Sequence, residues 1–128
     1  MRQQRNAEAA ARIEERRRRE AEAPRLAATV PTLEKLRLEC SERAANILRP
    51  EHTHVRHVVV QSAPALFVVP CHDSRCKDGG HDLTAAILAA LKTRKERFTG
   101  DDACSGVVGS SACSRVLDYV GVATYQAR

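Results

Sequence analysis

Apolar and polar residues alternate over residues 35–41, which is the pattern of a β-strand that buries one face. Leu36, Leu38 and Cys40 share the inner face of that strand, so Cys40 is expected to be a core thiol rather than a metal ligand. A helix over residues 33–48 would also align apolar side chains, and the sequence leaves both interpretations open.

Three further segments have strand patterns. Residues 55–60 and 65–69 are rich in β-branched side chains, and the four residues between them predict a hairpin. Residues 43–53 are expected to form a loop. Residues 115–125 alternate again, and Gly121 in their middle indicates a bulge or bend. The expected inner face of this last strand carries Leu117, Tyr119, Ala123 and Tyr125.

One helix is predicted with both of its ends. After a turn at Gly79 and Gly80, Asp82 can cap the first helical turn, and Gly100 can end the helix. Residues 99–114 are small and polar, so they are expected to form a loop. The apolar face of the helix carries Leu83, Ile87, Leu88, Leu91 and Phe98.

The first 23 residues consist mainly of Arg, Glu, Gln and Ala, and Ile13 is the only large apolar residue after Met1. Because no apolar stripe is present, residues 1–23 are predicted to be a solvated helix or a disordered tail. Residues 24–31 are bracketed by two prolines and predict a linker, so the folded domain is expected to span 32–127. A second interpretation gives the tail a contact with phosphates or an acidic partner through Arg16, Arg17, Arg18 and Arg19.

Composition predicts a small hydrophobic core that needs additional stabilisation by disulfides or a metal ion. Hydrophobic residues make up 43% of the chain, but many are alanine, and the chain has no Trp, two Phe and two Tyr. Small cores of this kind are often completed by disulfides or metal. The five cysteines and the absence of a charged-then-apolar leader favour a cytoplasmic chain that binds metal. No run of eighteen apolar residues occurs, so no membrane contact is expected.

Four cysteines form the candidate metal site. Cys71 and Cys76 are separated by four residues, the upper limit of the spacing typical of zinc ligand pairs. Cys104 and Cys113 are separated by eight residues, which predicts an open loop. The helix between the two pairs can bring the chain back toward the first pair. Both pairs can therefore lie at the same end of the domain. The sequence therefore predicts zinc bound by these four cysteines.

Histidines offer other ligands. His81 follows Cys76 by five residues and is a possible substitute if Cys113 does not bind, but the sequence favours a position at the surface or beside the ligands. The three histidines within residues 52–57 are divided between two strand faces, so no three-histidine site is expected.

Residues 67–71 look like an opening strand that ends in a cysteine, residues 79–80 look like a Gly-Gly helix start, and residues 104–106 look like a later cysteine loop. Together they resemble thioredoxin-like two-iron ferredoxins over about half of the domain. In that family the first two cysteines lie further apart and the last two lie closer together. The resemblance implies a [2Fe–2S] cluster on the same four cysteines and a role in electron transfer or redox sensing.

Catalytic patterns are incomplete in this chain. It has no His-x-Glu with Pro-Cys-x-x-Cys, no Cys-x-x-Cys and no glycine-rich phosphate loop. Adjacent Cys71 and His72 lack the geometry of a nucleophile and its base. We therefore expect no enzyme and no small-molecule substrate.

The net charge of +5 and the pI near 9.2 indicate an anionic partner. The sequence as a whole predicts an α+β domain with a small antiparallel β-sheet, one packed helix and a four-cysteine metal site. Its predicted function is that of a regulatory zinc-binding module that contacts nucleic acid or an acidic protein surface. Because metal binding and folding are coupled in such modules, chelation is expected to melt the domain.

Overall fold

The computed structural model describes residues 2–127, so Met1 and Arg128 lie outside it. Its helices are α1 (Arg2–Glu22), α2 (Leu26–Thr29) and α3 (Thr84–Lys92). Its strands are β1 (Leu33–Ala44), β2 (His52–Val58), β3 (Val68–Val69), β4 (His81–Asp82), β5 (Arg97–Ala103), β6 (Val107–Val108), β7 (Ser111–Ala112) and β8 (Arg115–Tyr125).

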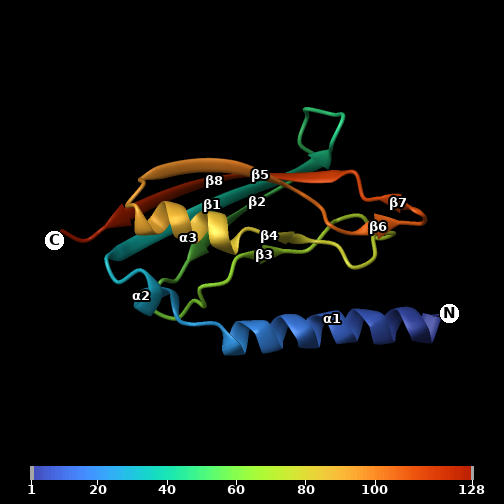
Figure 1. Cartoon of the computed structure of the whole chain (residues 1–128), viewed down its shortest axis with the longest axis horizontal. Helices are drawn as coiled ribbons and strands as arrows, with labels where there is room; N and C mark the ends of the chain where they lie inside the picture. The colour runs from blue at the N-terminus through green and yellow to red at the C-terminus, as the bar shows by residue number, and fades with distance from the viewer. Residues whose placement is uncertain (1, 128) are drawn as a thin grey trace.

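One four-stranded antiparallel sheet organises the domain, with the strand order β2-β1-β8-β5. The two longest strands, β1 and β8, form its central pair. α3 and the β3–β4 ribbon lie on one side of this sheet, and α1 lies beyond them (Figure 1). The predicted α+β architecture, with a small antiparallel sheet and a packed helix, is confirmed.

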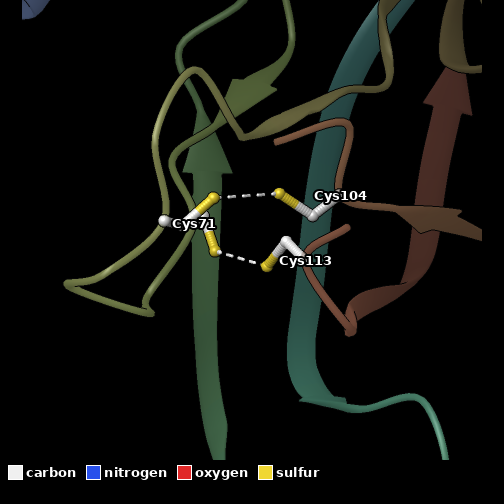
Figure 2. Close-up of side chains that lie close together, drawn as sticks. Cys71, Cys104 and Cys113 are labelled. Carbon is white, nitrogen blue, oxygen red and sulfur yellow. Dashed lines mark hydrogen bonds between the residues drawn. The ribbon is translucent and has the colours of Figure 1, made fainter. Parts of the chain in front are cut away.

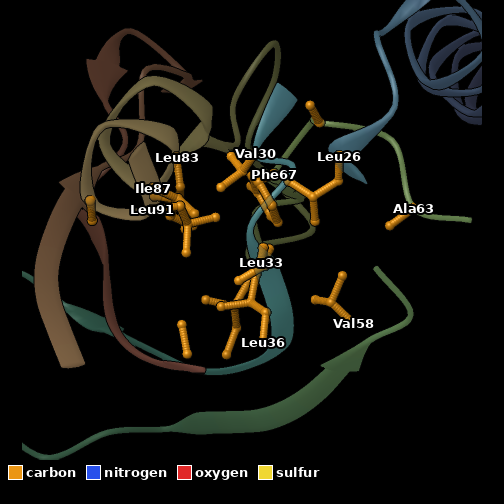
Figure 3. Packing of buried hydrophobic residues seen from close by; sticks show 14 of the residues in the cluster. Leu26, Val30, Leu33, Leu36, Val58, Ala63, Phe67, Leu83, Ile87 and Leu91 are labelled. Carbon is orange, nitrogen blue, oxygen red and sulfur yellow. The ribbon is translucent and has the colours of Figure 1, made fainter. Parts of the chain in front are cut away.

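The inner face of the sheet carries the core. The alternation predicted for β1 is present, which excludes the helical alternative. α3 and the segment that precedes β3 cover this face with Ile87, Leu91 and Phe67, all at most 2% exposed (Figure 3). The buried residues of the central strands are Leu36, Leu38, Cys40, Leu117, Tyr119 and Ala123.

The predicted hairpin between residues 55–60 and 65–69 is wrong. β2 pairs instead with residues 36–42 of β1 in a seven-residue ladder. The second segment contributes only the two-residue β3, which pairs with β4. Pro64 and Pro70 bracket that segment, and proline has no N–H to donate to a ladder, so a long strand is disfavoured there.

The predicted helix is too long. α3 ends at Lys92, and Arg94 adopts a left-handed conformation with φ of 57°. The Lys95 N–H then donates to the Ala90 carbonyl at 3.1 Å, which closes the last turn in the manner of a Schellman motif. Because Arg takes the position usually held by glycine, the sequence pattern did not mark this end.

β5 occupies part of the segment that was expected to be a loop over residues 99–114. Phe98 leaves the predicted helix face and lies on the sheet opposite Gly121. A Cβ atom at Gly121 would lie 2.1 Å from the Phe98 ring, so this glycine makes room for the aromatic side chain. The predicted bulge at Gly121 is wrong, because the β1–β8 register shift lies between Leu33 and Lys35.

Residues 24–31 pack into the domain instead of forming a free linker. Leu26, in α2, is completely buried, and Val30 is 3% exposed. The Leu26 N–H donates to the Ala63 carbonyl at 2.9 Å, and the Ala65 N–H donates to the Pro24 carbonyl at 2.8 Å. The apolar core therefore begins before residue 32.

Candidate metal centre

The sulfur atoms of four cysteines lie together where β5 stops and β8 begins (Figure 2). The Sγ atoms of Cys71, Cys76, Cys104 and Cys113 all lie within 4.8 Å of one another. Cys71 Sγ is 3.8 Å from Cys113 Sγ, and Cys76 Sγ is 3.6 Å from Cys104 Sγ. A disulfide requires about 2.05 Å, so the four side chains are free thiols around a common centre. A metal ion can bind there.

The distances between the sulfurs match the edges of a coordination tetrahedron. With zinc–sulfur bonds of about 2.3 Å, the edge of a regular tetrahedron is about 3.8 Å. The sulfur–sulfur separations of 3.6 and 3.8 Å are close to this value, and the upper limit of 4.8 Å leaves a modest distortion. The four cysteines chosen from the sequence are thus the ones that the fold brings together.

The wide spacing between Cys104 and Cys113 is explained by a small hairpin. β6 and β7 pair with each other, and Gly109 in their turn has φ of 62°. The Cys113 N–H donates to the Gly106 carbonyl at 2.9 Å, which returns the second cysteine beside the first. The open loop expected here is therefore a closed turn, although eight residues separate the two cysteines.

Backbone pairing joins this hairpin to the loop that carries Cys71 and Cys76. The Lys77 N–H donates to the Val107 carbonyl at 2.8 Å, and the Val107 N–H donates back to the Lys77 carbonyl at 3.0 Å. The two halves of the site, 27 residues apart in sequence, consequently form one backbone unit.

Backbone N–H groups point at the sulfurs. Gly80 and Gly106 donate to Cys104 Sγ at 3.3 and 3.4 Å, and Asp73 donates to Cys71 Sγ at 3.5 Å. Such donors stabilise a thiolate more than a thiol. Gly106 must also lack a side chain, because a Cβ atom there would lie 2.5 Å from Cys76 Sγ. The loop backbone is therefore shaped around the sulfurs.

The thiols differ in their acidity. Burial raises the pKa of Cys71 well above its usual range and raises the pKa of Cys76 to about 12. For Cys104 burial acts in the same direction, but hydrogen bonds from the N–H groups of Gly106 and Gly80, together with those of the neighbouring thiols, outweigh it and lower its pKa. Without metal, burial thus favours the protonated form of Cys71 and Cys76, and the backbone donors favour the thiolate form of Cys104.

His81, the possible substitute ligand, lies beside two carboxylates. Its side chain is fully buried, and Nδ1 lies 3.0 Å from Asp102 Oδ2. Nε2 lies 3.7 Å from Glu42 Oε2 and has no hydrogen-bond partner among the described residues. Because the four sulfurs already complete a tetrahedral set, no histidine is needed as a fourth ligand.

Glu42 and Arg115 support the site and were missed in the sequence. Glu42 is 1% exposed, accepts the N–H of His72 at 3.1 Å, and accepts Arg115 Nε at 2.8 Å. Arg115 also donates to Glu51 at 2.8 Å. The alternation of buried residues in β1 continues past Cys40, and this pattern places the Glu42 carboxylate on the inner face. Only a partner from β8 makes that placement favourable.

The three histidines of β2 are divided as predicted. His52 and His54 stand opposite Glu42 and Cys40 on the inner face, and His57 stands opposite Arg37 on the outer face. The His52 ring stacks on that of His72, with centroids 4.3 Å apart.

The arginine cluster of α1 is engaged in exposed ion pairs. Arg17 lies 3.7 Å from Glu14, and Arg18 pairs with Glu15 and, at 3.1 Å, with Glu22. Arg19 reaches Asp82 of β4 at 3.1 Å. Side-chain exposure of these three arginines is between 40% and 72%. Contact of Arg16 to Arg19 with phosphates or an acidic partner stays a prediction.

No family model, curated protein or solved structure matches the chain. The resemblance to thioredoxin-like ferredoxins therefore stays a prediction. Within residues 2–127, no helix is long and apolar enough to cross a membrane.

Proposed function

We propose that Cys71, Cys76, Cys104 and Cys113 bind one zinc ion and that the chain is a regulatory binding module rather than an enzyme. The observation that carries this proposal is the arrangement of four sulfurs within 4.8 Å, with separations close to a tetrahedral edge. Four protein thiolates fill the coordination shell of zinc, and a catalytic zinc keeps one position for water or substrate.

A single ion fits these distances better than a two-iron cluster. In a [2Fe–2S] cluster, two thiolates bind each iron, so sulfurs on different irons are separated by the additional iron–iron distance. Here every pair of sulfurs lies within 4.8 Å. The two-iron alternative would require the loops to move apart.

The proposed partner surface is α1, with nucleic-acid phosphates as its first candidate ligand. Its ion pairs are exposed and screened by solvent, so a polyanion can replace the glutamates as partners of Arg17 and Arg18. Duplex binding should weaken steeply with salt, and changing Arg16 to Arg19 to Gln should remove it. If binding is undetectable at low salt, the acidic protein surface replaces nucleic acid in the proposal.

Metal analysis of anaerobically purified protein tests the metal. We expect a colourless protein with one zinc per chain. A brown protein that contains iron and sulfide would overturn the assignment in favour of the two-iron cluster. Each single Cys→Ser change in the cluster should lower metal affinity, and the matched control Cys40→Ser should leave the metal content unchanged, because Cys40 lies in the apolar core.

Metal affinity should rise with pH. Since the pKa values of Cys71 and Cys76 are raised by burial, zinc must displace protons from these thiols. Lower pH favours the protonated thiols and releases the metal, and higher pH strengthens binding. Competition against a zinc indicator from mildly acidic to mildly alkaline pH measures this slope, and a flat profile would contradict thiol ligation.

A further inference from the structure

A pocket of about 610 Å³ lies on the inner face of the sheet, between the edge strand β2 and the segment that includes β3. No residue of α3 lines it, and Ala86 and Ala90 of the helix instead line a separate hollow with Phe98 of β5 and Tyr119 of β8. The β2 side of the same face therefore remains open. Its volume is within the range of about 300–1,000 Å³ typical of sites for small organic ligands.

The pocket has an apolar floor. Leu38, Cys40, Phe67 and Leu83 line it, and each is at most 4% exposed. These side chains belong to the main core, so the floor is held by packing and does not depend on a ligand. An apolar ligand body placed there would lose contact with water, which favours binding.

The rim is formed by nitrogen-bearing side chains. Strand register places His52, His54 and Arg56 on the inner face of β2, opposite Glu42, Cys40 and Leu38. His72 completes the rim from the loop after β3 and stacks on His52. All four side chains line the pocket and carry nitrogen atoms that can donate hydrogen bonds.

Arg56 has no ion pair or side-chain hydrogen bond among the described residues. The guanidinium groups of Arg43, Arg75 and Arg115, in contrast, each hold a carboxylate at 3.0 Å or less. The acidic residue that lines the pocket, Glu51, is already paired with Arg115 at 2.8 Å. The pocket consequently presents a fixed positive charge above an apolar floor.

We propose that this pocket binds a small organic carboxylate with an aromatic or branched aliphatic body. The carboxylate pairs with Arg56 and accepts hydrogen bonds from the rim histidines, and the body lies against Phe67 and Leu83. A planar guanidinium suits a carboxylate because it can donate two parallel hydrogen bonds. This site is separate from the four sulfurs and does not depend on which metal they bind.

Titration with 1-naphthylacetate, followed by calorimetry, tests the proposal. Its neutral analogue 1-naphthylacetamide has the same body, so the difference between the two isolates the charge. We expect saturable binding of the acid, about tenfold tighter than the amide, as one charge-assisted contact predicts. Absence of saturable binding at millimolar acid, or equal affinity for the two probes, would overturn it.

Two variants test whether Arg56 supplies the positive charge that binds the carboxylate. Arg56→Gln, at an exposed position of an edge strand, should abolish the preference for the acid without unfolding the domain. Arg37→Gln is the matched control, because Arg37 lies on the neighbouring strand but on the outer face, opposite His57. An unchanged preference in Arg56→Gln would overturn the assignment.

Amide chemical shifts distinguish this pocket from a second one. A hollow of about 330 Å³ between α1 and the β3 segment is also lined by cations and apolar side chains, including Arg12, Arg16 and Leu66. Binding in the proposed pocket should shift the amides of residues 53–56. Shifts confined to residues 12–19 would place the acid under α1 and overturn the proposal.

Discussion

The two ends of the sheet are held by different forces. At one end, α2, α3 and the segment before β3 pack nineteen buried residues into a continuous core. At the other end, the buried cluster consists of Cys76, Cys104 and Cys113, with Cys71 and Val108 partly buried against them. Apolar burial is distributed over many side chains. The cysteine end depends on four atoms and on whatever binds them.

The difference shows how a chain with few aromatic residues can order long loops. α3 and the core fix the positions where β4 and β5 start, and the loops then extend past the reach of apolar packing. The metal that we propose for the four cysteines would replace the missing core locally, because its binding free energy is available only when the loops are in place. The following experiments test this division, in order of decreasing expected effect.

Removing the metal with a chelator should destabilise only the cysteine end of the sheet. We expect amide hydrogen exchange to accelerate over residues 71–82 and 104–114 after metal removal, with residues 36–40 and 87–91 still protected. Structural zinc sites have apparent binding free energies of about 10–16 kcal/mol, so the local effect should be large. If all four segments exchange together, the domain is one cooperative unit and melts as the sequence alone predicted.

Leu91→Ala should affect the other end. Leu91 is completely buried in the core, and truncation of such a residue typically lowers the free energy of unfolding by about 2–5 kcal/mol. Urea denaturation measures this change, and the number of metal ions bound per chain should stay the same. Leu48→Ala is the control, because Leu48 is 89% exposed and its truncation should change stability by less than about 0.5 kcal/mol.

Glu42→Gln acts at the boundary between the two ends. Glu42 continues the inner face of β1 but binds Arg115 and the His72 N–H, so it joins the core strand to the metal loop. We expect a loss of about 1.5–3 kcal/mol in unfolding free energy, since a charge-assisted hydrogen bond is weakened. Glu39→Gln, on the outer face of the same strand, serves as control and should be nearly neutral, because its side chain is 41% exposed and its ion pair with Arg37 is long, at 3.8 Å. Equal effects would show that Glu42 does not couple the two ends.

Arg19→Ala should have the smallest effect. Arg19 and Asp82 are 40% and 52% exposed, so their ion pair should contribute less than about 1 kcal/mol to stability. Thermal melts with Arg17→Ala as reference measure it. A larger loss would show that α1 is an integral part of the fold.

Much of the sheet was predictable because its strands carry a period-two pattern. The inner faces of β1 and β8 follow directly from the alternation that places Leu36 and Leu117 in the core. Strand partners were not predictable, because nothing local distinguishes pairing of β2 with β1 from pairing with residues 65–69. The end of α3 was missed because Arg94 takes a left-handed conformation that glycine usually adopts.

The four sulfurs of the candidate site were predictable from residue type, but their surroundings were not. Cysteines are rare enough that a cluster of them is itself a signal. Glu42, Arg115 and the β6–β7 hairpin act through contacts between segments far apart in sequence. Such contacts arise from the fold and leave no mark in a short window of residues.

The ion pair between Arg19 and Asp82 also limits how strongly binding at α1 can change the metal affinity of the cysteine cluster. It links α1 to β4, next to the buried His81 and the loop that carries Cys76. By thermodynamic reciprocity, a ligand that pulls α1 away from β4 changes metal affinity by the same factor as the metal changes affinity for that ligand. Since an exposed pair contributes at most about 1 kcal/mol, coupling through this contact is limited to about fivefold. This ion pair by itself therefore transmits little between α1 and the cysteine cluster, and it does so equally in both directions.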